Sequence, residues 1–490
     1  PYTTLFRSDE RILTIDDVVS WQNMPMFPLF VTATCEFSRF DDHTRTSAGE
    51  LTFTNPRGGA IAMITTARTT GGSGPLLRRT FRRMFTMQGG EYPTMGDIFF
   101  ATKQDPSKYT RVFTLFGDPA LRLAYPKNNV VLTKINGKPV TPPADTVCYN
   151  DTLKALSAIE LRGELQDNFG ELMTDFNGVV RVSVYDKENT YRTKGDKGFA
   201  QVNFKLRNSL LFDGVATVES GEFAIEFTVP KDINYAYGKG LISFYATDYQ
   251  TDANGMYGNV IVGGYNDAAL PDVDGPEARI FIDDTLFVSG GITNENPLFY
   301  AIIRDEHGIN TTGAGIGHDI TATLSGATNK IYNLNSYYEN PTDANDYGII
   351  AYRLYGLNEG KHQLSFRVWD IYNNSTNVSI EFTVVRSGNL TVENLYNTPN
   401  PMTSYTSFCF EHNQKGDMDI AINIYNLNGQ LVKTIKDSRY GTSTRIDPIV
   451  WDGTSNNGAA LPSGVYIYNV TVTNSDNEKQ TGYSKLVIAR

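Results

Sequence analysis

The chain has 490 residues, too many for one hydrophobic core, and a size of about 150 residues per domain predicts three or four domains. The net charge of -11 excludes general electrostatic attraction to nucleic acid, so no nucleic-acid partner is expected. The three cysteines, Cys35, Cys148 and Cys409, are too few and too scattered for a disulfide framework or a zinc cluster. No apolar run approaches the roughly 20 residues that a membrane-spanning helix needs.

The first eight residues, PYTTLFRS, are expected not to belong to the natural protein. They resemble the translated end of a sequencing adapter, and the chain does not begin with methionine. We therefore leave residues 1–8 out of the fold prediction, and we expect the natural protein to extend upstream.

Residues 9–125 carry two apolar runs that predict buried strands. The runs at 27–34 (FPLFVTAT) and 60–65 (AIAMIT) do not alternate between apolar and polar residues. This pattern is typical of strands that are covered on both faces, as in a parallel sheet. The segment is therefore expected to contain such a sheet.

Helices are expected around these strands, at 47–55, 75–87 and 94–103. The last of them has Thr94 at its start and Asp97 three residues later, which is the spacing of a capping box. Strands that alternate with helices indicate an open α/β sheet.

From about residue 126 the pattern changes to half-buried strands. Segments such as 178–186 (GVVRVSVYD) and 221–230 (GEFAIEFTVP) alternate apolar and polar residues. Turn signals recur about every 8–12 residues, which predicts all-β immunoglobulin-like sandwiches. The expected order is an α/β domain at 9–125 followed by β-sandwiches at 126–268, 269–388 and 389–490.

Cys35 is the strongest candidate for chemistry. It directly follows the first buried strand, and open α/β sheets place their sites at the carboxyl ends of their strands. A cysteine can act there as a nucleophile once a base, usually a histidine, takes its proton. The residues alone leave the alternative that Cys35 is a half-buried structural thiol.

Three segments resemble the gingipain family of cysteine peptidases. They are FVTATCEFSRFDD around Cys35, NPRGGAIAMITTART at 55–69 and FTLFGDPALRL at 113–123. The resemblance implies a partial caspase-like α/β domain in which Cys35 is the nucleophile. It also implies that Thr65 and Thr66 border the pocket for the residue before the cut bond. The alternative for this threonine pair is plain β-propensity.

The resemblance further implies a catalytic histidine in a G-H-G turn ahead of the cysteine. No such turn precedes Cys35 here, so we expect this histidine to lie upstream and the printed chain to be inactive. His43 lies in the loop after Cys35, and His318 lies in GIGHDI, within a predicted sandwich. Neither is expected to be the base. We expect His318 to be a turn histidine that bonds to Asp319 or to the backbone.

A narrower resemblance is to the sortases of the type IX secretion system. It rests on CEFSRFD at 35–41, SAGE at 47–50, and the segments 211–240, 305–320 and 396–410. Residues 396–490 also resemble the C-terminal sorting domain of type IX cargo, with the motifs WDG and GVY. The resemblance implies an endopeptidase and transpeptidase that removes sorting domains from cargo proteins, holds the cargo as an acyl-enzyme on Cys35, and attaches it to the cell surface.

The same resemblance implies the partners and the compartment. The partners would be cargo proteins with type IX C-terminal domains, outer-membrane attachment proteins and anionic lipopolysaccharide, and the protein would be secreted to the bacterial outer membrane and cell surface. Two alternatives stay open: a secreted gingipain-like protease that degrades external proteins, and a non-enzymatic surface adhesin. The first alternative, with specificity for Arg or Lys, would need a carboxylate in its substrate pocket. The segment ITTARTT at 64–70 contains no carboxylate.

Two further patterns have a plain and a functional interpretation. A basic stripe is predicted on the helix at 75–87, formed by Arg78, Arg79, Arg82 and Arg83. It is either a solvated helix face or a contact for an anionic glycan. The Asp-rich segments 251–259 and 342–348 do not complete the calcium-loop pattern. Ordinary turns are expected there, and no cofactor is expected beyond the alternative of structural calcium.

Overall fold

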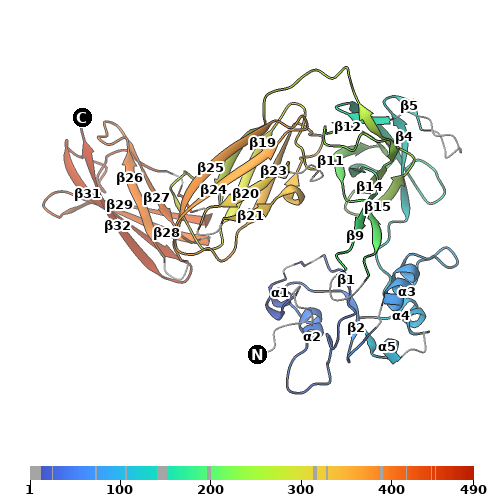
Figure 1. The fold of residues 1–490 in the computed structure, drawn as a ribbon. Helices are drawn as coiled ribbons and strands as arrows, with labels where there is room; N and C mark the ends of the chain where they lie inside the picture. Colours follow the sequence, from blue (N-terminus) through green and yellow to red (C-terminus); the bar gives the residue numbers. More distant parts are fainter. Residues whose placement is uncertain are drawn as a thin grey trace. The chain divides into compact units, whose positions relative to one another are not determined.

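The computed structural model describes residues 13–490 apart from 22, 25, 72–73, 105–107, 141–151, 196–199, 313–316, 327–328, 387–389, 415, 443 and 447. The predictions on residues 1–8 and on Cys148 lie outside the described residues. The chain divides into two units, Pro1–Tyr125 and Pro126–Arg490. The fold is mostly β-structure with few helices (Figure 1), as predicted. None of the described helices is long and apolar enough to cross a membrane.

The first unit is a three-stranded sheet flanked by helices, in the strand order β1-β2-β3. Its elements are α1 (Ile15–Ser20), β1 (Leu29–Val31), α2 (Ala48–Phe53), β2 (Ala62–Thr66), α3 (Gly74–Met84), α4 (Met95–Lys103), α5 (Lys108–Arg111) and β3 (Phe113–Phe116). Strands β1 and β2 are parallel, which confirms the predicted pair, whereas β3 runs antiparallel to β2. In Figure 1, α1 and α2 lie on one side of this sheet, and α3 and α4 lie on the other.

Capping boxes fix where the helices begin. The Thr94 hydroxyl accepts the Asp97 N–H at 3.2 Å, and the Asp97 carboxylate accepts the Thr94 N–H at 3.0 Å, which confirms the predicted cap. Ser47 and Glu50 form the same box at the start of α2, with distances of 3.3 and 2.8 Å. Such caps satisfy backbone donors that have no partner inside the helix. The cap of α2 therefore sets the helix start only a short loop after Cys35.

Strand β2 is the centre of the first unit, and all five of its residues are buried. Ala62 and Ile64 pack with residues of α3 and α4. Because side chains alternate along a strand, Met63 and Thr65 point to the opposite face. That face carries α2 and the loop that follows β1.

The second unit begins with a region whose main sheet has eight strands, in the order β15-β14-β8-β11-β12-β7-β4-β5. A smaller sheet, β13-β16-β6, shares its hydrophobic core. A separate ribbon pairs β9 with β10. The strands are β4 (Asn128–Ile135), β5 (Lys138–Pro139), β6 (Thr152–Ala155), β7 (Ala158–Gln166), β8 (Gly178–Tyr185), β9 (Asn189–Arg192), β10 (Asn203–Leu206), β11 (Leu210–Glu219), β12 (Glu222–Thr228), β13 (Gly238–Lys239), β14 (Leu241–Thr247), β15 (Asp252–Tyr257) and β16 (Ile261–Tyr265).

One feature of this region was not expected from the sequence, and one sequence expectation is corrected. The large sheet closes on itself, because β15 also pairs with β4 in parallel, with Ala253 opposite Asn128. A plain two-sheet sandwich has no such closure. The Asp-rich segment 251–259, expected to be a turn, is largely strand β15. An immunoglobulin-like topology stays a prediction.

The next region has two sheets around one core, ordered β17-β19-β23-β22 and β18-β25-β24-β20-β21. Its elements are β17 (Glu277–Ile282), β18 (Ile292–Thr293), β19 (Leu298–Arg304), β20 (Thr321–Leu324), β21 (Lys330–Asn333), η3 (Asn335–Tyr337), β22 (Tyr338–Glu339), β23 (Tyr347–Arg353), β24 (Gly360–Trp369) and β25 (Ser375–Val384).

The last region forms two further sheets, β26-β27-β30 and β29-β28-β31-β32. They share a core that contains Trp451 and the fully buried Tyr468. The strands are β26 (Val392–Thr398), β27 (Thr406–His412), β28 (Gly416–Tyr425), β29 (Leu431–Thr442), β30 (Ile449–Trp451), β31 (Gly464–Asn474) and β32 (Lys479–Ile488).

Candidate active site

Cys35 lies just beyond the carboxyl end of β1, in the turn that leads to α2. The ladder continues past the strand, because the Thr32 N–H donates to the Ile64 carbonyl at 3.0 Å. The cysteine is half-buried and forms no disulfide. This is the edge at which open α/β sheets present their reactive groups.

The contacts of the Cys35 sulfur are to the backbone of one residue. The Thr70 N–H donates to Sγ at 3.4 Å, and Sγ lies 3.3 Å from the Thr70 carbonyl. The thiol thus donates to the Thr70 carbonyl and accepts from the Thr70 N–H. Among the described residues, no acceptor is hydrogen-bonded to the Cys35 N–H.

The turn that carries Cys35 is bound to the end of β2. Glu36 has a φ of +57°, in the left-handed region, which costs a non-glycine residue on the order of 1 kcal/mol. The bonds that hold this conformation are Glu36 N–H to Arg68 O at 3.4 Å, Ser38 N–H to Thr66 O at 2.9 Å, and the Thr66 hydroxyl to Thr34 O. The position of the thiol is thus set by β2.

Thr65 and Thr66 support this turn from within the sheet. Both are fully buried. The Thr65 hydroxyl lies 3.3 Å from that of Ser38, on the α2 side of the sheet. The predicted role of the two threonines at the rim of a substrate pocket stays a prediction.

Helix α2 approaches the same turn closely at Gly49. The Gly49 N–H donates to the Phe37 carbonyl at 2.9 Å. A Cβ on Gly49 would lie 1.7 Å from the Ser38 hydroxyl, so any larger residue would displace the turn. This contact gives a physical reason for glycine in the SAGE segment.

The loop after Cys35 carries carboxylates that arginines neutralise. Glu36 pairs with Arg39 at 3.3 Å and with Arg45 at 3.6 Å. Asp41 pairs with Arg68, whose hydrogen bond lowers the pKa of that carboxyl. Hydrogen bonds from Thr44 lower the pKa of Asp42 to about 2. These acids are therefore engaged within the loop.

The histidines do not supply a base to this thiol. Among the described residues, no histidine is hydrogen-bonded to Cys35, and His43 is exposed in the loop. His318 bonds through Nδ1 to Asp232, and its ring lies 4.4 Å from that of Trp369. The expectation that His318 bonds to Asp319 or to the backbone is therefore wrong. The true partner is 86 residues away in sequence.

The Asp-rich segments 251–259 and 342–348, for which calcium was the alternative to ordinary turns, contribute no residue to a metal-ligating group among the described residues. Asp343, in the second segment, instead accepts the Thr217 N–H at 2.8 Å. The group that does gather is Asp272, Asp305 and His307, whose ligand atoms lie within 4.8 Å of one another. Burial raises the pKa of Asp305 to about 6. Acidic groups often gather without an ion, so this cluster defines no metal site.

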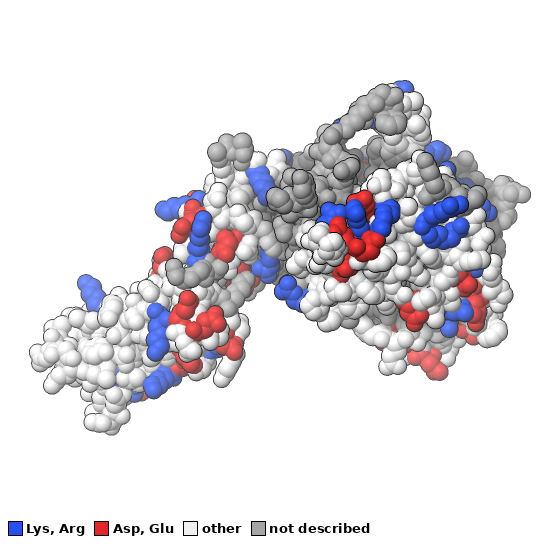
Figure 2. Space-filling model, turned by 90° about the horizontal axis from the view of Figure 1, so that it is seen from below, with Lys and Arg blue, Asp and Glu red and all other residues white. Residues whose placement is uncertain are grey.

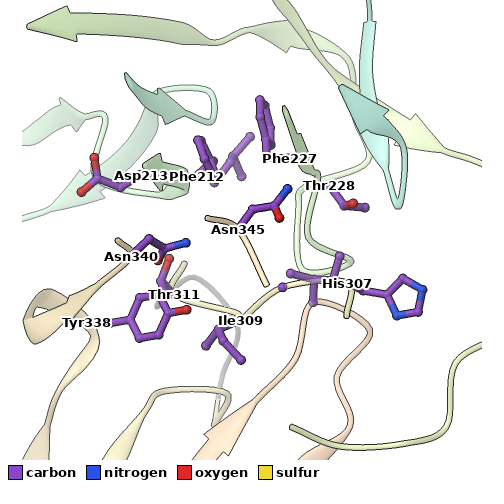
Figure 3. A pocket seen from close by; sticks show the side chains of 13 residues that line it. Phe212, Asp213, Phe227, Thr228, His307, Ile309, Thr311, Tyr338, Asn340 and Asn345 are labelled. Carbon is purple, nitrogen blue, oxygen red and sulfur yellow. The ribbon is translucent and has the colours of Figure 1, made fainter. Parts of the chain in front are cut away.

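A cavity of about 30 Å³ lies in the second unit, and Figure 3 shows its lining. Two lining atoms, Tyr338 Oη and Asn340 Oδ1, are buried without a hydrogen-bond partner among the described protein groups. A cavity of this size holds one or two waters. It cannot accept a peptide, so it is not a peptidase site.

Sequence reasoning missed the partner of the thiol. Thr70 contacts Cys35 through its backbone, which leaves no residue-type signal. The contacts of Ser38 with Thr65 and with helix α2 were also missed, although the SAGE segment at 47–50 lies at the start of that helix. The site is thus a cysteine held by backbone contacts at the edge of an α/β sheet.

Family models match both ends of the chain. Residues 3–124 match peptidase family C25, and residues 391–486 match the CHU_C type IX secretion signal domain. The segment that carries Cys35 is therefore similar to peptidase family C25, the gingipain family. The chain thus joins this segment to a type IX secretion signal domain.

A solved structure, dimeric latent PorU from Porphyromonas gingivalis, is similar at 31% sequence identity, over 83% of this chain and 39% of that chain, with a TM-score of 0.36. The present chain thus spans about two fifths of PorU. A bacterial ice-binding adhesin (11% identity, over 74% of this chain and 98% of that chain) and Escherichia coli alpha-2-macroglobulin (8% identity, over 69% and 24%) have TM-scores of 0.16. A search of curated proteins found no match.

Proposed function

We propose that this chain is the C-terminal part of a PorU-like sortase of the type IX secretion system. The observation that carries the proposal is the half-buried Cys35 thiol at the carboxyl end of β1, in a segment that matches family C25, on a chain that also has a type IX secretion signal domain. The proposed domains are a caspase-like part at 9–125 and immunoglobulin-like sandwiches at 126–268, 269–388 and 389–490.

The proposed reaction is acyl transfer through Cys35. A general base takes the thiol proton, and the thiolate attacks a cargo peptide carbonyl ahead of the sorting domain. The Cys35 N–H donates to the oxyanion, and the C–N bond breaks as the leaving amine gains a proton. The thioester on Cys35 is then resolved by water or by an amine on lipopolysaccharide, which restores the thiol.

The base and the pocket belong to the same proposal. We assign the base to a histidine outside the described residues, and we expect the printed chain to have no peptidase activity by itself. Thr65 and Thr66 are assigned to the pocket border, as the resemblance implies. Their buried hydroxyl groups would act by fixing the turn that carries Cys35.

The function is tested with a purified cargo protein, assayed with and without its C-terminal sorting domain. We expect the histidine-containing enzyme to cut only the cargo that carries the domain, and to join the product to an added amine. Equal cutting of both substrates would contradict the sortase and support a general protease. Absence of cutting in the presence of the histidine would support the adhesin.

Deleting residues 391–490 is expected to keep the protein from the cell surface. We propose that this domain directs secretion and that outer-membrane attachment proteins are the partners there. The domain has its own core, centred on Tyr468, so its removal leaves the first unit intact. Cell fractionation is the measurement. Arrival of the truncated protein at the outer surface would contradict the sorting role.

A further inference from the structure

Helix α3 exposes a stripe of alternating basic and aromatic side chains. Arg78, Phe81 and Arg82 of α3 and Phe85, in the turn directly after the helix, are all exposed and follow one another at intervals of one to three residues. We call these four residues the α3 stripe. The opposite side of the helix buries Leu76, Thr80 and Met84 in the core of the first unit. The helix is attached to its unit through this buried side, and of the stripe Phe85 also contacts Tyr125, with the two ring centroids 6.0 Å apart.

The two arginines of the stripe have no acidic partner. Among the described residues, the guanidinium groups of Arg78 and Arg82 form no ion pair and no hydrogen bond. Neighbouring cations are engaged, since Arg83 donates to the Thr86 carbonyl at 3.0 Å and Arg122 pairs with Glu91 at 2.6 Å. Figure 2 shows Lys and Arg side chains gathered in several places on one face of the molecule, in some with Asp and Glu beside them and in others without.

The aromatic members of the stripe are exposed to solvent. Phe81 is 48% exposed and Phe85 is 66% exposed, and Met87 follows at 51%. Apolar side chains in this number are costly to leave in water, and such patches mark interaction sites. A solvated helix face would explain the arginines alone, but it does not explain the phenylalanines between them.

We propose that the α3 stripe binds an anionic lipid bilayer surface. A guanidinium forms paired hydrogen bonds with a phosphate, and a phenylalanine beside it enters the boundary between headgroups and acyl chains. The charge complementarity to an anionic surface is confined to the α3 stripe, because the chain as a whole carries a net charge of -11. This inference goes beyond the proposed function, and its test does not involve Cys35.

The test is sedimentation of the full 490-residue chain with vesicles. We expect binding to vesicles of phosphatidylcholine with about 30% phosphatidylglycerol, and not to phosphatidylcholine alone. Arg78→Ala with Arg82→Ala should weaken binding about 10- to 30-fold, since each arginine near an anionic surface contributes about 1 kcal/mol. Phe81→Ser with Phe85→Ser should weaken it at high salt as well as at low salt.

Two further variants keep the result interpretable. Lys361→Ala with Lys479→Ala removes two exposed cations elsewhere and should bind like the parent chain. Arg78→Lys with Arg82→Lys keeps the charge and should retain most binding, which separates loss of charge from loss of fold. Equal binding to both vesicle types, or equal loss in the two-lysine control, would overturn the proposal, and so would capture of the chain by acidic proteins without binding to vesicles.

Discussion

A Cys35→Ala enzyme is expected to lose at least about 10³-fold in kcat/KM, while its fold stays intact. The loss follows because no thioester can form without the sulfur. The fold is spared because the side chain is half-buried and contacts only the Thr70 backbone. The measurement is cleavage of a cargo peptide by the form of the enzyme that carries its histidine.

The control is Cys409→Ala. Cys409 is 3% exposed in β27, so its truncation is expected to lower the stability of the last region and to leave turnover unchanged. A Cys35→Ala enzyme with activity within a few-fold of the parent would show that Cys35 is a structural thiol.

Acid is expected to destabilise the last region by about 2 kcal/mol between pH 7 and pH 4.5. His412 at the end of β27 is fully buried, and neither ring nitrogen has a hydrogen-bond partner among the described groups. Burial lowers the pKa of His412 from 6.5 to about 4. Below pH 6.5, His412 therefore binds a proton in the unfolded chain but stays neutral in the folded chain. Stability is complete above pH 6.5 and falls as the pH drops toward 4.

Hydrogen exchange in strands β27, β28 and β31 measures this loss within the region that contains His412. A His412→Leu variant, compared at each pH with the parent chain, should lose less than about 1 kcal/mol over the same interval, because leucine cannot titrate. An equal loss in both proteins would assign the acid sensitivity to other groups.

Local sequence rules predicted the elements but not the contacts between them. The parallel pair β1–β2 was predictable, because 27–34 and 60–65 are apolar without alternation. The cap of α4 was predictable from Thr94 and Asp97 alone. The closure of β15 on β4 was not, because it joins segments more than 120 residues apart and leaves no residue-type pattern.

In the candidate site, too, the position of a residue was predictable from the sequence, whereas its contacts were not. The place of Cys35 followed from strand order and from its resemblance to a peptidase family. Its contact with Thr70 runs through backbone atoms, and the bond of His318 to Asp232 spans 86 residues, so neither could be inferred from spacing. The exposure of Phe81 and Phe85 also needed the structure, because a helical pattern does not show which face meets solvent.

The most direct test of the central claim is to trap the acyl-enzyme. The histidine-containing enzyme is mixed with a cargo peptide, quenched in acid, digested and analysed by mass spectrometry. We predict that the cargo acyl group is attached to the peptide that contains Cys35, and that hydroxylamine removes it. Cleavage that proceeds with the acyl group on Cys148 or Cys409, or with no covalent adduct on any cysteine, would contradict the account.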